Sequence, residues 1–266
     1  MLGERGENVS RDHWSNNVCP STPSGGDRVK LVRRLDHVVA VLPRAEEAFR
    51  HLVNDLGLPE AWPFADYGGF VSGGVGFGNL NVEIVQGRSD NHSPRPSRFS
   101  ALAFEPVSAV DDDFLATLDD RGLRFTGPLV TSGWTNVDLP GLLDGVHTFI
   151  CDYHIPGAKD ASLRREALSA NQGGALGVVA VIEVVIGVRD VGATVAECSK
   201  LLGPTVTSKG DAWAGDEGPN LRVVSSDEVG VLNLVVDARL RDRVDEWQSS
   251  RTFHDPLDGL AFSFTE

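Results

Sequence analysis

The chain has 266 residues, 41% hydrophobic and 23% charged, which is ordinary for a globular protein with a substantial core. Its formal net charge of -14 argues against nucleic acid and anionic membrane surfaces as partners, because both attract basic proteins. No apolar run reaches the roughly 20 residues of a membrane span and no signal-peptide pattern is present, so a cytoplasmic location is expected. Cys19, Cys151 and Cys198 are too widely spaced for a disulfide scaffold or a zinc knuckle.

Hydrophobic periodicity predicts two successive units of strand, helix and further strands. Residues 1–30 have no such periodicity and are expected to form a disordered leader. The first unit is predicted over the strand Leu31–Leu42, the helix Arg44–Leu56 and strands at Trp62–Phe64, Gly68–Gly78 and Asn79–Gln86. The second is predicted over the strand Arg98–Pro106, the helix Asp111–Arg121 and strands at Leu123–Pro128, Trp134–Leu139 and Val146–Tyr153.

Two shorter units follow a polar, charged stretch at residues 157–176, which is predicted to be a linker. The third is predicted over the strand Val178–Val188, the helix Asp190–Leu202 and the strand Asn220–Ser225, and the fourth over Gly230–Val236, the helix Ala238–Trp247 and Gly259–Phe264. We therefore expect a first pair of modules over residues 31–156 and a second, abbreviated pair over 177–266.

The first and third units repeat one another. Residues 35–39 align with residues 181–185, and Leu56-Gly57 aligns with Leu202-Gly203 without a gap. After a short deletion, Asn79-Leu80 aligns with Asn220-Leu221. This self-similarity predicts an internal duplication.

Several segments carry a resemblance to a known family. The strand Leu-Asp-His-Val-Val, the helix ending Leu-Gly-Leu, the glycine-rich hairpin and the strand containing Val-Glu-Ile resemble the vicinal-oxygen-chelate superfamily. That superfamily includes glyoxalase I, methylmalonyl-CoA epimerase, extradiol dioxygenases and bleomycin-resistance proteins, and Phe149–Tyr153 with the later linker is most similar to its glyoxalase-like branch. The resemblance implies an α+β fold of tandem βαβββ modules that form curled half-barrels around a divalent metal.

The same resemblance suggests a set of metal ligands. It implies that His37 on the first strand and Glu83 on a later strand bind the metal, and a mixed N/O pair of this kind suits Zn, Mn, Fe or Ni. Strand alternation agrees with this, because it places His37 on one face with Leu35, Val39 and Val41, and Glu83 on the face opposite Leu80, Val82 and Ile84. The second module departs from the pattern, because Ser100-Ala101-Leu102 stands where a histidine is usual and only Asp152 and His154 are close to the closing glutamate position.

Three functions remain open at this point. The first is a metal-dependent lyase, isomerase or dioxygenase acting on a small substrate through two neighbouring oxygens, with Glu83 or Glu183 moving a proton. The second is a metal-free protein that binds a hydrophobic or aromatic small molecule, and the third is a scaffold whose pocket is vestigial. The predicted substrate pocket is lined by Trp62, Phe70, Trp134 and Tyr153, which Phe64 would join in a binding protein. A homodimer is left open.

Overall fold

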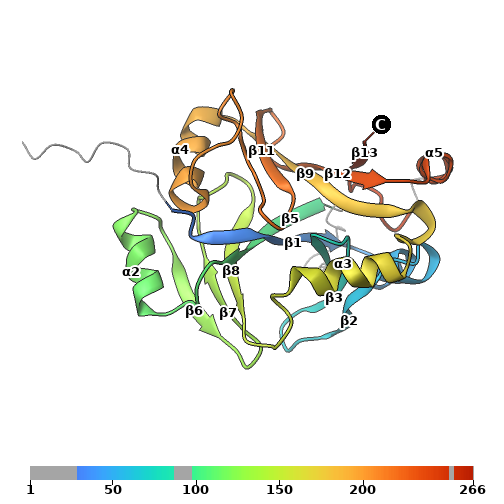
Figure 1. The fold of residues 1–266 in the computed structure, drawn as a ribbon, viewed down its shortest axis with the longest axis horizontal. Coiled ribbons are helices and arrows are strands. Elements are labelled where there is room, and N and C mark those ends of the chain that lie inside the picture. The colour runs from blue at the N-terminus through green and yellow to red at the C-terminus, as the bar shows by residue number, and fades with distance from the viewer. Residues whose placement is uncertain (1–28, 87–97, 252–254, 266) are drawn as a thin grey trace, which may run out of the picture.

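The computed structural model describes residues 29–86, 98–251 and 255–265. Apart from its last two residues, the predicted leader lies outside these ranges, as does Cys19. The described chain forms two curled sheets with few helices, which confirms the expected α+β class (Figure 1). None of its helices is long and apolar enough to cross a membrane.

The larger sheet has eight strands in the order β2-β3-β4-β1-β5-β8-β7-β6. Its central strands β1 and β5 are antiparallel, whereas β1 is parallel to β4 and β5 is parallel to β8. Two modules of four strands therefore meet along the β1–β5 pair. The strands are β1 (Val32–Leu42), β2 (Glu60–Asp66), β3 (Val71–Gly76), β4 (Asn81–Gln86), β5 (Arg98–Pro106), β6 (Thr126–Val130), β7 (Trp134–Asp138) and β8 (His147–Tyr153).

The smaller sheet has five strands in the order β10-β11-β9-β12-β13. Its central strand β9 is parallel to β11 and antiparallel to β12, and β12 is parallel to β13, so the arrangement around β1 is repeated with fewer strands. The strand β10 was not expected from the sequence. The strands are β9 (Val178–Val188), β10 (Ala212–Trp213), β11 (Asn220–Ser225), β12 (Gly230–Ala238) and β13 (Phe262–Phe264).

The duplication extends to the irregularities of the strands. In β1 the pairing with β5 shifts between Val32 and Arg34, Leu35 and His37, and Val39 and Ala40. In β9 the pairing with β12 shifts at the matching places, between Val178 and Ala180, Val181 and Glu183, and Val185 and Ile186. His37 and Glu183 therefore occupy equivalent positions, each following one bulge residue.

The parallel pairing corrects one part of the sequence alignment. His37 is paired with Asn81 and Glu183 with Asn220, so the counterpart of Asn220 is Asn81 and not Asn79. Asn79 instead joins the two sheets, because its side chain donates to the carbonyl of Val181 at 2.8 Å and accepts from its N–H at 2.9 Å.

The helices are short, and α2, α3 and α4 begin at aspartates that cap them. Asp111, Asp160 and Asp190 each accept a hydrogen bond from a backbone N–H of the first turn that follows. The helices are α1 (Ala45–Arg50), which continues into the π-helical η1 (His51–Asp55), α2 (Asp112–Asp120), α3 (Ala161–Ala170), the 3-10 segment η2 (Gly174–Leu176), α4 (Val191–Leu202) and α5 (Arg241–Ser250).

Helix α3 lies within the stretch that was predicted to be a linker. It contacts β3 and β9 and buries Ala161 and Leu168, which lie on one helical face (Figure 1). The many charged and polar residues of this segment obscure the short apolar face in the sequence pattern. The segment is therefore a helix that bridges the two sheets.

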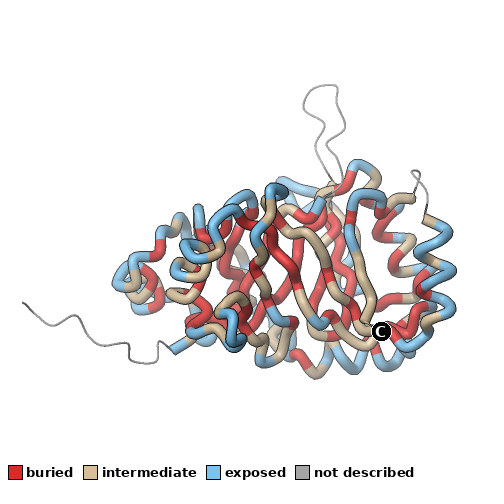
Figure 2. The backbone as a smooth tube through the Cα atoms, turned by 90° about the horizontal axis from the view of Figure 1, so that it is seen from above, coloured by how far each residue is buried: buried red, intermediate tan, exposed pale blue. Residues whose placement is uncertain are grey.

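Two apolar clusters divide the residues of the central strands between the two faces of the larger sheet. The larger cluster is shared by both sheets and includes Leu35 and Val38, whereas the smaller one comprises Val39, Ala101, Ala103, Phe149 and Cys151. Leu35 was expected on the face of His37 and Val39, which is wrong because the bulge at Asp36 adds a residue between them. The buried residues lie mainly along the strands, and the exposed residues lie mainly on helices and loops (Figure 2).

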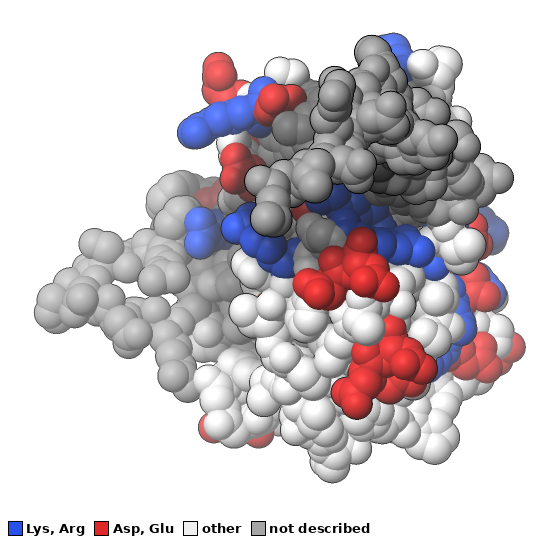
Figure 3. Space-filling view, turned by 90° about the vertical axis from the view of Figure 1, so that its left-hand side faces the viewer, with Lys and Arg blue, Asp and Glu red and all other residues white. Residues whose placement is uncertain are grey.

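The charged surface is mixed in sign where Figure 3 shows it. Clusters of acidic side chains lie beside basic ones on an otherwise uncharged face, in spite of the net charge of -14. This face therefore offers no broad surface of a single sign.

Candidate functional site

His37 lies on the face of the larger sheet that carries the smaller apolar cluster. The residue is 4% exposed, and its ring packs edge-on against Trp62 and Phe149, with centroid distances of 5.9 and 5.5 Å. Its Nε2 is 3.6 Å from Oε2 of Glu83 on β4. The structure thus brings together the two residues of the first module that were expected to bind a metal.

The other ring nitrogen of His37 is held by Asp36, the bulge residue before it. Nδ1 is 2.8 Å from Asp36 Oδ2, and the Tyr153 hydroxyl donates to the same oxygen at 2.9 Å. Arg164 of α3 donates to Asp36 Oδ1 at 2.6 Å. Asp36 is completely buried, which alone would raise its pKa, but Arg164, His37 and Arg34 together hold the pKa of this carboxyl well below its usual range.

A second buried ion pair supports Asp36. Arg34 Nη2 lies 2.5 Å from Glu105 Oε2 and 3.7 Å from Asp36 Oδ1. Burial raises the pKa of Glu105, and the neighbouring Arg34 only partly offsets this. The positive charges of Arg34 and Arg164 therefore offset the negative charges of Asp36 and Glu105 beneath His37.

This arrangement defines what the imidazole can do. When Nδ1–H donates to Asp36, the neutral ring presents the Nε2 lone pair toward the Glu83 carboxylate. Two acceptors 3.6 Å apart repel unless a proton or a donor group of a ligand lies between them. The side chain of Glu83 is 13% exposed and that of His37 is 5% exposed, so Glu83 is the more accessible member of the pair.

The donor set does not fit a resident metal ion. Asp152 receives hydrogen bonds from Lys159 and from the Val110 N–H, and His154 Nε2 lies 3.0 Å from the Thr135 hydroxyl. Neither residue joins His37 and Glu83. Among the residues with described positions, no group of three or more His, Cys, Asp or Glu side chains is arranged to hold a metal.

The second module contributes small or neutral side chains to the smaller apolar cluster beside His37. Its contributions there include Ala101 and Cys151, and burial raises the pKa of the Cys151 thiol, which is therefore neutral. His37 and Glu83 supply two donors, whereas protein-held catalytic zinc uses three.

Glu183 lies in a different environment from His37, although the two positions are equivalent. Its Oε2 is 2.8 Å from Arg222 Nη2 on the neighbouring strand β11, and this pairing raises the pKa of Arg222. Within the described ranges, Glu183 is paired with Arg222 and with no imidazole, so its catalytic role stays a prediction.

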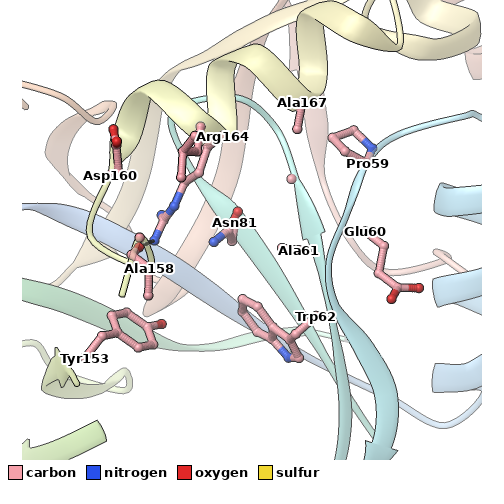
Figure 4. A pocket seen from close by; sticks show the side chains of 13 residues that line it. Pro59, Glu60, Ala61, Trp62, Asn81, Tyr153, Ala158, Asp160, Arg164 and Ala167 are labelled. Carbon is pink, nitrogen blue, oxygen red and sulfur yellow. Dashed lines mark hydrogen bonds between the residues drawn. The ribbon is translucent and has the colours of Figure 1, made fainter. Parts of the chain in front are cut away.

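A pocket of about 230 Å³ lies next to the His37 site (Figure 4). It is lined by Trp62 of β2, Asn81 of β4, Tyr153 of β8 and Arg164 of α3, whose side chain extends from the helix toward Ala158 and Tyr153. Trp62 and Tyr153 also surround His37, so the pocket and the His37–Glu83 pair share walls.

The remaining predicted pocket residues lie elsewhere. Phe70 is 40% exposed and stacks on Tyr67, Phe64 packs against Phe49, and Trp134 packs against the smaller apolar cluster. None of the three lines this pocket.

Sequence reasoning missed Asp36, Asn81 and Arg164. A carboxylate next to a histidine in an apolar strand was a usable signal for Asp36, and Asn81 shares the face of Glu83 by simple alternation. Arg164 had no comparable signal, because its position depends on where α3 packs.

Comparison with known proteins bears on the fold. No protein-family model and no curated protein matches the chain. A hypothetical protein from Staphylococcus aureus is similar in structure, with a TM-score of 0.58 and 10% identity over 87% of this chain and 98% of that one. One variant structure of homoprotocatechuate 2,3-dioxygenase from B. fuscum aligns with a TM-score of 0.54 and 13% identity over 84% of this chain.

The chain spans only 62% of the length of that dioxygenase. A second variant structure of the enzyme aligns with a TM-score of 0.55 and 12% identity, covering 91% of this chain and 78% of the other. At these identities the likeness establishes the fold alone. It confirms the vicinal-oxygen-chelate fold that the sequence motifs had suggested.

Proposed function

We propose that this chain, which has the vicinal-oxygen-chelate fold, is an enzyme of the isomerase or lyase type that transfers a proton on a small oxygenated molecule. The fold alone does not determine the reaction, because one fold can support several chemistries and the side chains of the site select among them. The supporting observation is the His37 imidazole held between two carboxylates, with Asp36 at 2.8 Å and Glu83 at 3.6 Å. Dioxygenase chemistry is not part of the proposal, because the donor set does not fit a resident metal.

The residues have separate roles in this proposal. Glu83, the more accessible of the pair, takes a proton from a carbon next to a carbonyl group of the substrate, and the carbonyl oxygen receives the charge. His37 accepts or returns that proton at Nε2. Asp36 orients the ring and stabilises its protonated form, and it keeps its own charge because Arg164 and Arg34 lie beside it.

Burial supports this functional interpretation. A glutamate side chain opposite a buried histidine costs stability where it lies beside an apolar cluster, and residues such as Val39, Ala103 and Phe149 form that cluster. A purely structural strand would be more stable with an apolar residue at position 83. The presence of the His37–Glu83 pair is therefore best explained by a catalytic role.

Proton exchange provides a direct test. The protein is incubated in D₂O with a panel of 2-hydroxy ketones and 2-keto acids, and loss of the C–H signal is followed by ¹H NMR. We expect exchange with at least one member, and a decrease of about 10²–10⁴-fold in Glu83→Gln and His37→Gln. Glu183→Gln, at the equivalent position of the smaller sheet, is the matched control and should keep the wild-type rate. Equal rates in all four proteins would refute the assignment.

A second candidate is a metal-free binding protein for an apolar or aromatic molecule. It is favoured by one observation, which is that the second module contributes Ala101 and Cys151 rather than charged groups to the same face. Under this alternative a panel member binds saturably without C–H exchange, and Glu83→Gln leaves binding unchanged.

A further inference from the structure

Tyr67 and Phe70 form an exposed aromatic pair on the turn that joins β2 to β3. Their rings stack with centroids 6.0 Å apart, and the two residues are 37% and 40% exposed. Single exposed apolar side chains are common on protein surfaces, whereas two rings in contact form a continuous apolar surface. Such a surface indicates a binding site for a ligand or a partner.

The strand register places this pair on the same face of the larger sheet as Glu83. Gly74 of β3 is paired with Glu83 of β4. Phe70 immediately precedes β3 and is four residues from Gly74, so strand alternation puts both residues on one face. The Tyr67 N–H donates to the Phe70 carbonyl at 3.0 Å, so Tyr67 lies opposite Phe70 in the hairpin, and opposite residues share a face. At about 3.3 Å per residue, the pair lies about 13 Å along the sheet from Glu83.

The Tyr67 side chain extends back toward the site. Its hydroxyl donates at 2.9 Å to the carbonyl of Pro63, the residue that follows Trp62. Trp62 in turn packs against His37, with ring centroids 5.9 Å apart. Burial raises the pKa of the Tyr67 phenol, and the carboxylate of Glu83 raises it further, which agrees with a phenol that lies near this carboxylate. The Tyr67 ring therefore occupies part of the distance between the exposed pair and Glu83.

We propose that the Tyr67–Phe70 pair binds a flat apolar group, such as a phenyl ring, of the molecule whose reacting carbon lies at Glu83. This inference names the substrate class for the proposed function and rests on it only for the reaction, because binding is measured without turnover. A ring that stacks on the pair removes apolar surface of both partners from water and adds a favourable contact between rings. The distance along the sheet requires a chain of several bonds between that ring and the reacting carbon.

Three uncharged ketones that differ only at one end test this inference. 1-Hydroxy-6-phenylhexan-2-one carries a phenyl ring, its cyclohexyl analogue carries a ring of similar size that is not flat, and 1-hydroxyhexan-2-one carries no ring. Each is titrated into ¹⁵N-labelled protein and followed by ¹H–¹⁵N NMR. We expect the phenyl probe to bind about tenfold more tightly than the ringless probe, with the cyclohexyl probe between them. The phenyl probe should also shift the amide signals of the turn that carries Tyr67 and Phe70.

Variants at position 70 complete the test. Phe70→Ala should weaken the phenyl probe about tenfold and leave the ringless probe unchanged, because that probe has no group to place on the pair. Phe70→Tyr, which keeps a flat ring, should bind the phenyl probe as the wild type does. Val206→Ala, at a residue between α4 and β10 that is 60% exposed, is the control and should change neither affinity. Preserved dispersion of the amide signals shows that each variant is folded.

Three outcomes overturn the inference. The first is that no probe binds, or that the phenyl and cyclohexyl probes bind equally tightly. The second is an unchanged affinity for the phenyl probe in folded Phe70→Ala. The third is self-association of the wild-type chain in sedimentation velocity that Phe70→Ala abolishes without a change in probe affinity, since the pair would then be an interface between copies. Failure of the proposed proton transfer is distinguishable, because no ketone would then exchange its C–H while the dependence of phenyl binding on Phe70 persists.

Discussion

Arg164 and Asp36 are 128 positions apart in sequence, yet the guanidinium of one donates to the carboxylate of the other at 2.6 Å. Asp36 in turn holds Nδ1 of His37 at 2.8 Å. A helix from the segment between the two sheets thus fixes the orientation of a histidine on the first strand. The following predictions depend on this chain of contacts and on the packing around it.

Removing the cation should destabilise the fold. In Arg164→Met, Asp36 loses its closest positive partner while it remains completely buried, which we expect to cost about 3–5 kcal/mol in the free energy of unfolding. Urea unfolding measures this difference. The neighbouring exposed Arg165→Met is the control and should change stability by less than about 0.5 kcal/mol. Equal effects of the two substitutions would contradict the role assigned to Arg164.

The low pKa of Asp36 makes stability depend on acid pH. The unfolded carboxyl has its ordinary pKa of 3.8, and the folded one has a lower value because Arg164, His37 and Arg34 outweigh burial. Below pH 3.8 the unfolded state therefore binds more protons than the folded state, and stability falls as pH falls toward the folded pKa. Unfolding free energies measured between pH 5 and pH 2 should show this decline, with a smaller slope in Asp36→Asn.

Glu105 should contribute with the opposite sign. Burial raises its pKa above 4.5 in the folded state, so its contribution is present below pH 4.5 and is lost as pH rises through the folded value. Glu105→Gln should therefore steepen the net loss of stability in acid. A flatter profile in this variant would show that the assigned direction is wrong.

Gly74 is expected to be required for the position of Trp62. A Cβ atom at position 74 would overlap the Trp62 indole, which forms a wall of the pocket and packs on His37. Gly74→Ala should cost about 1–3 kcal/mol and change the environment of the Trp62 side chain, as measured by urea unfolding and by its indole N–H signal. Gly69→Ala, where an added Cβ meets nothing within 4 Å, is the matched control.

The two described cysteines should resist alkylation in the native state. Burial raises the pKa of Cys198 to about 12, against an ordinary value of 9.0, and it raises that of Cys151 further. The thiolate population of Cys198 is then about a thousandfold below that of an ordinary thiol at the same pH. Iodoacetamide at pH 8 followed by peptide mass spectrometry should modify both residues only after unfolding in urea.

The sequence was informative where local pattern decides structure. The order of strands and helices around His37, and its repeat around Glu183, follow from hydrophobic periodicity. This periodicity shows which residues of a strand or helix lie on its buried face. Prediction failed where a single residue breaks that periodicity. The bulge at Asp36 places Leu35 on the face of the sheet opposite His37, and the amino-acid sequence contains no pattern that indicates this bulge.

The candidate ligands at the end of β8 show a second kind of limit. Asp152 was considered with Tyr153, yet adjacent strand residues point to opposite faces, and Asp152 is engaged by Lys159 and the Val110 N–H. Its partners come from two loops outside the sheet, one that follows β8 and one that precedes α2. Such contacts depend on tertiary packing, as does the arrival of Arg164, and a one-dimensional pattern does not contain them.

The position of α3 also makes the two halves of the chain interdependent. The larger sheet contains His37, Glu83 and Asp36, but the closest counter-charge of Asp36, Arg164, comes from a helix that packs on both β3 and β9. A fragment that ends before α3 would retain every strand of the larger sheet and would lack Arg164, the cation closest to the buried Asp36 carboxylate. The charge balance at Asp36 therefore depends on a segment outside the larger sheet, and without that segment only His37 and Arg34 would offset the buried carboxylate.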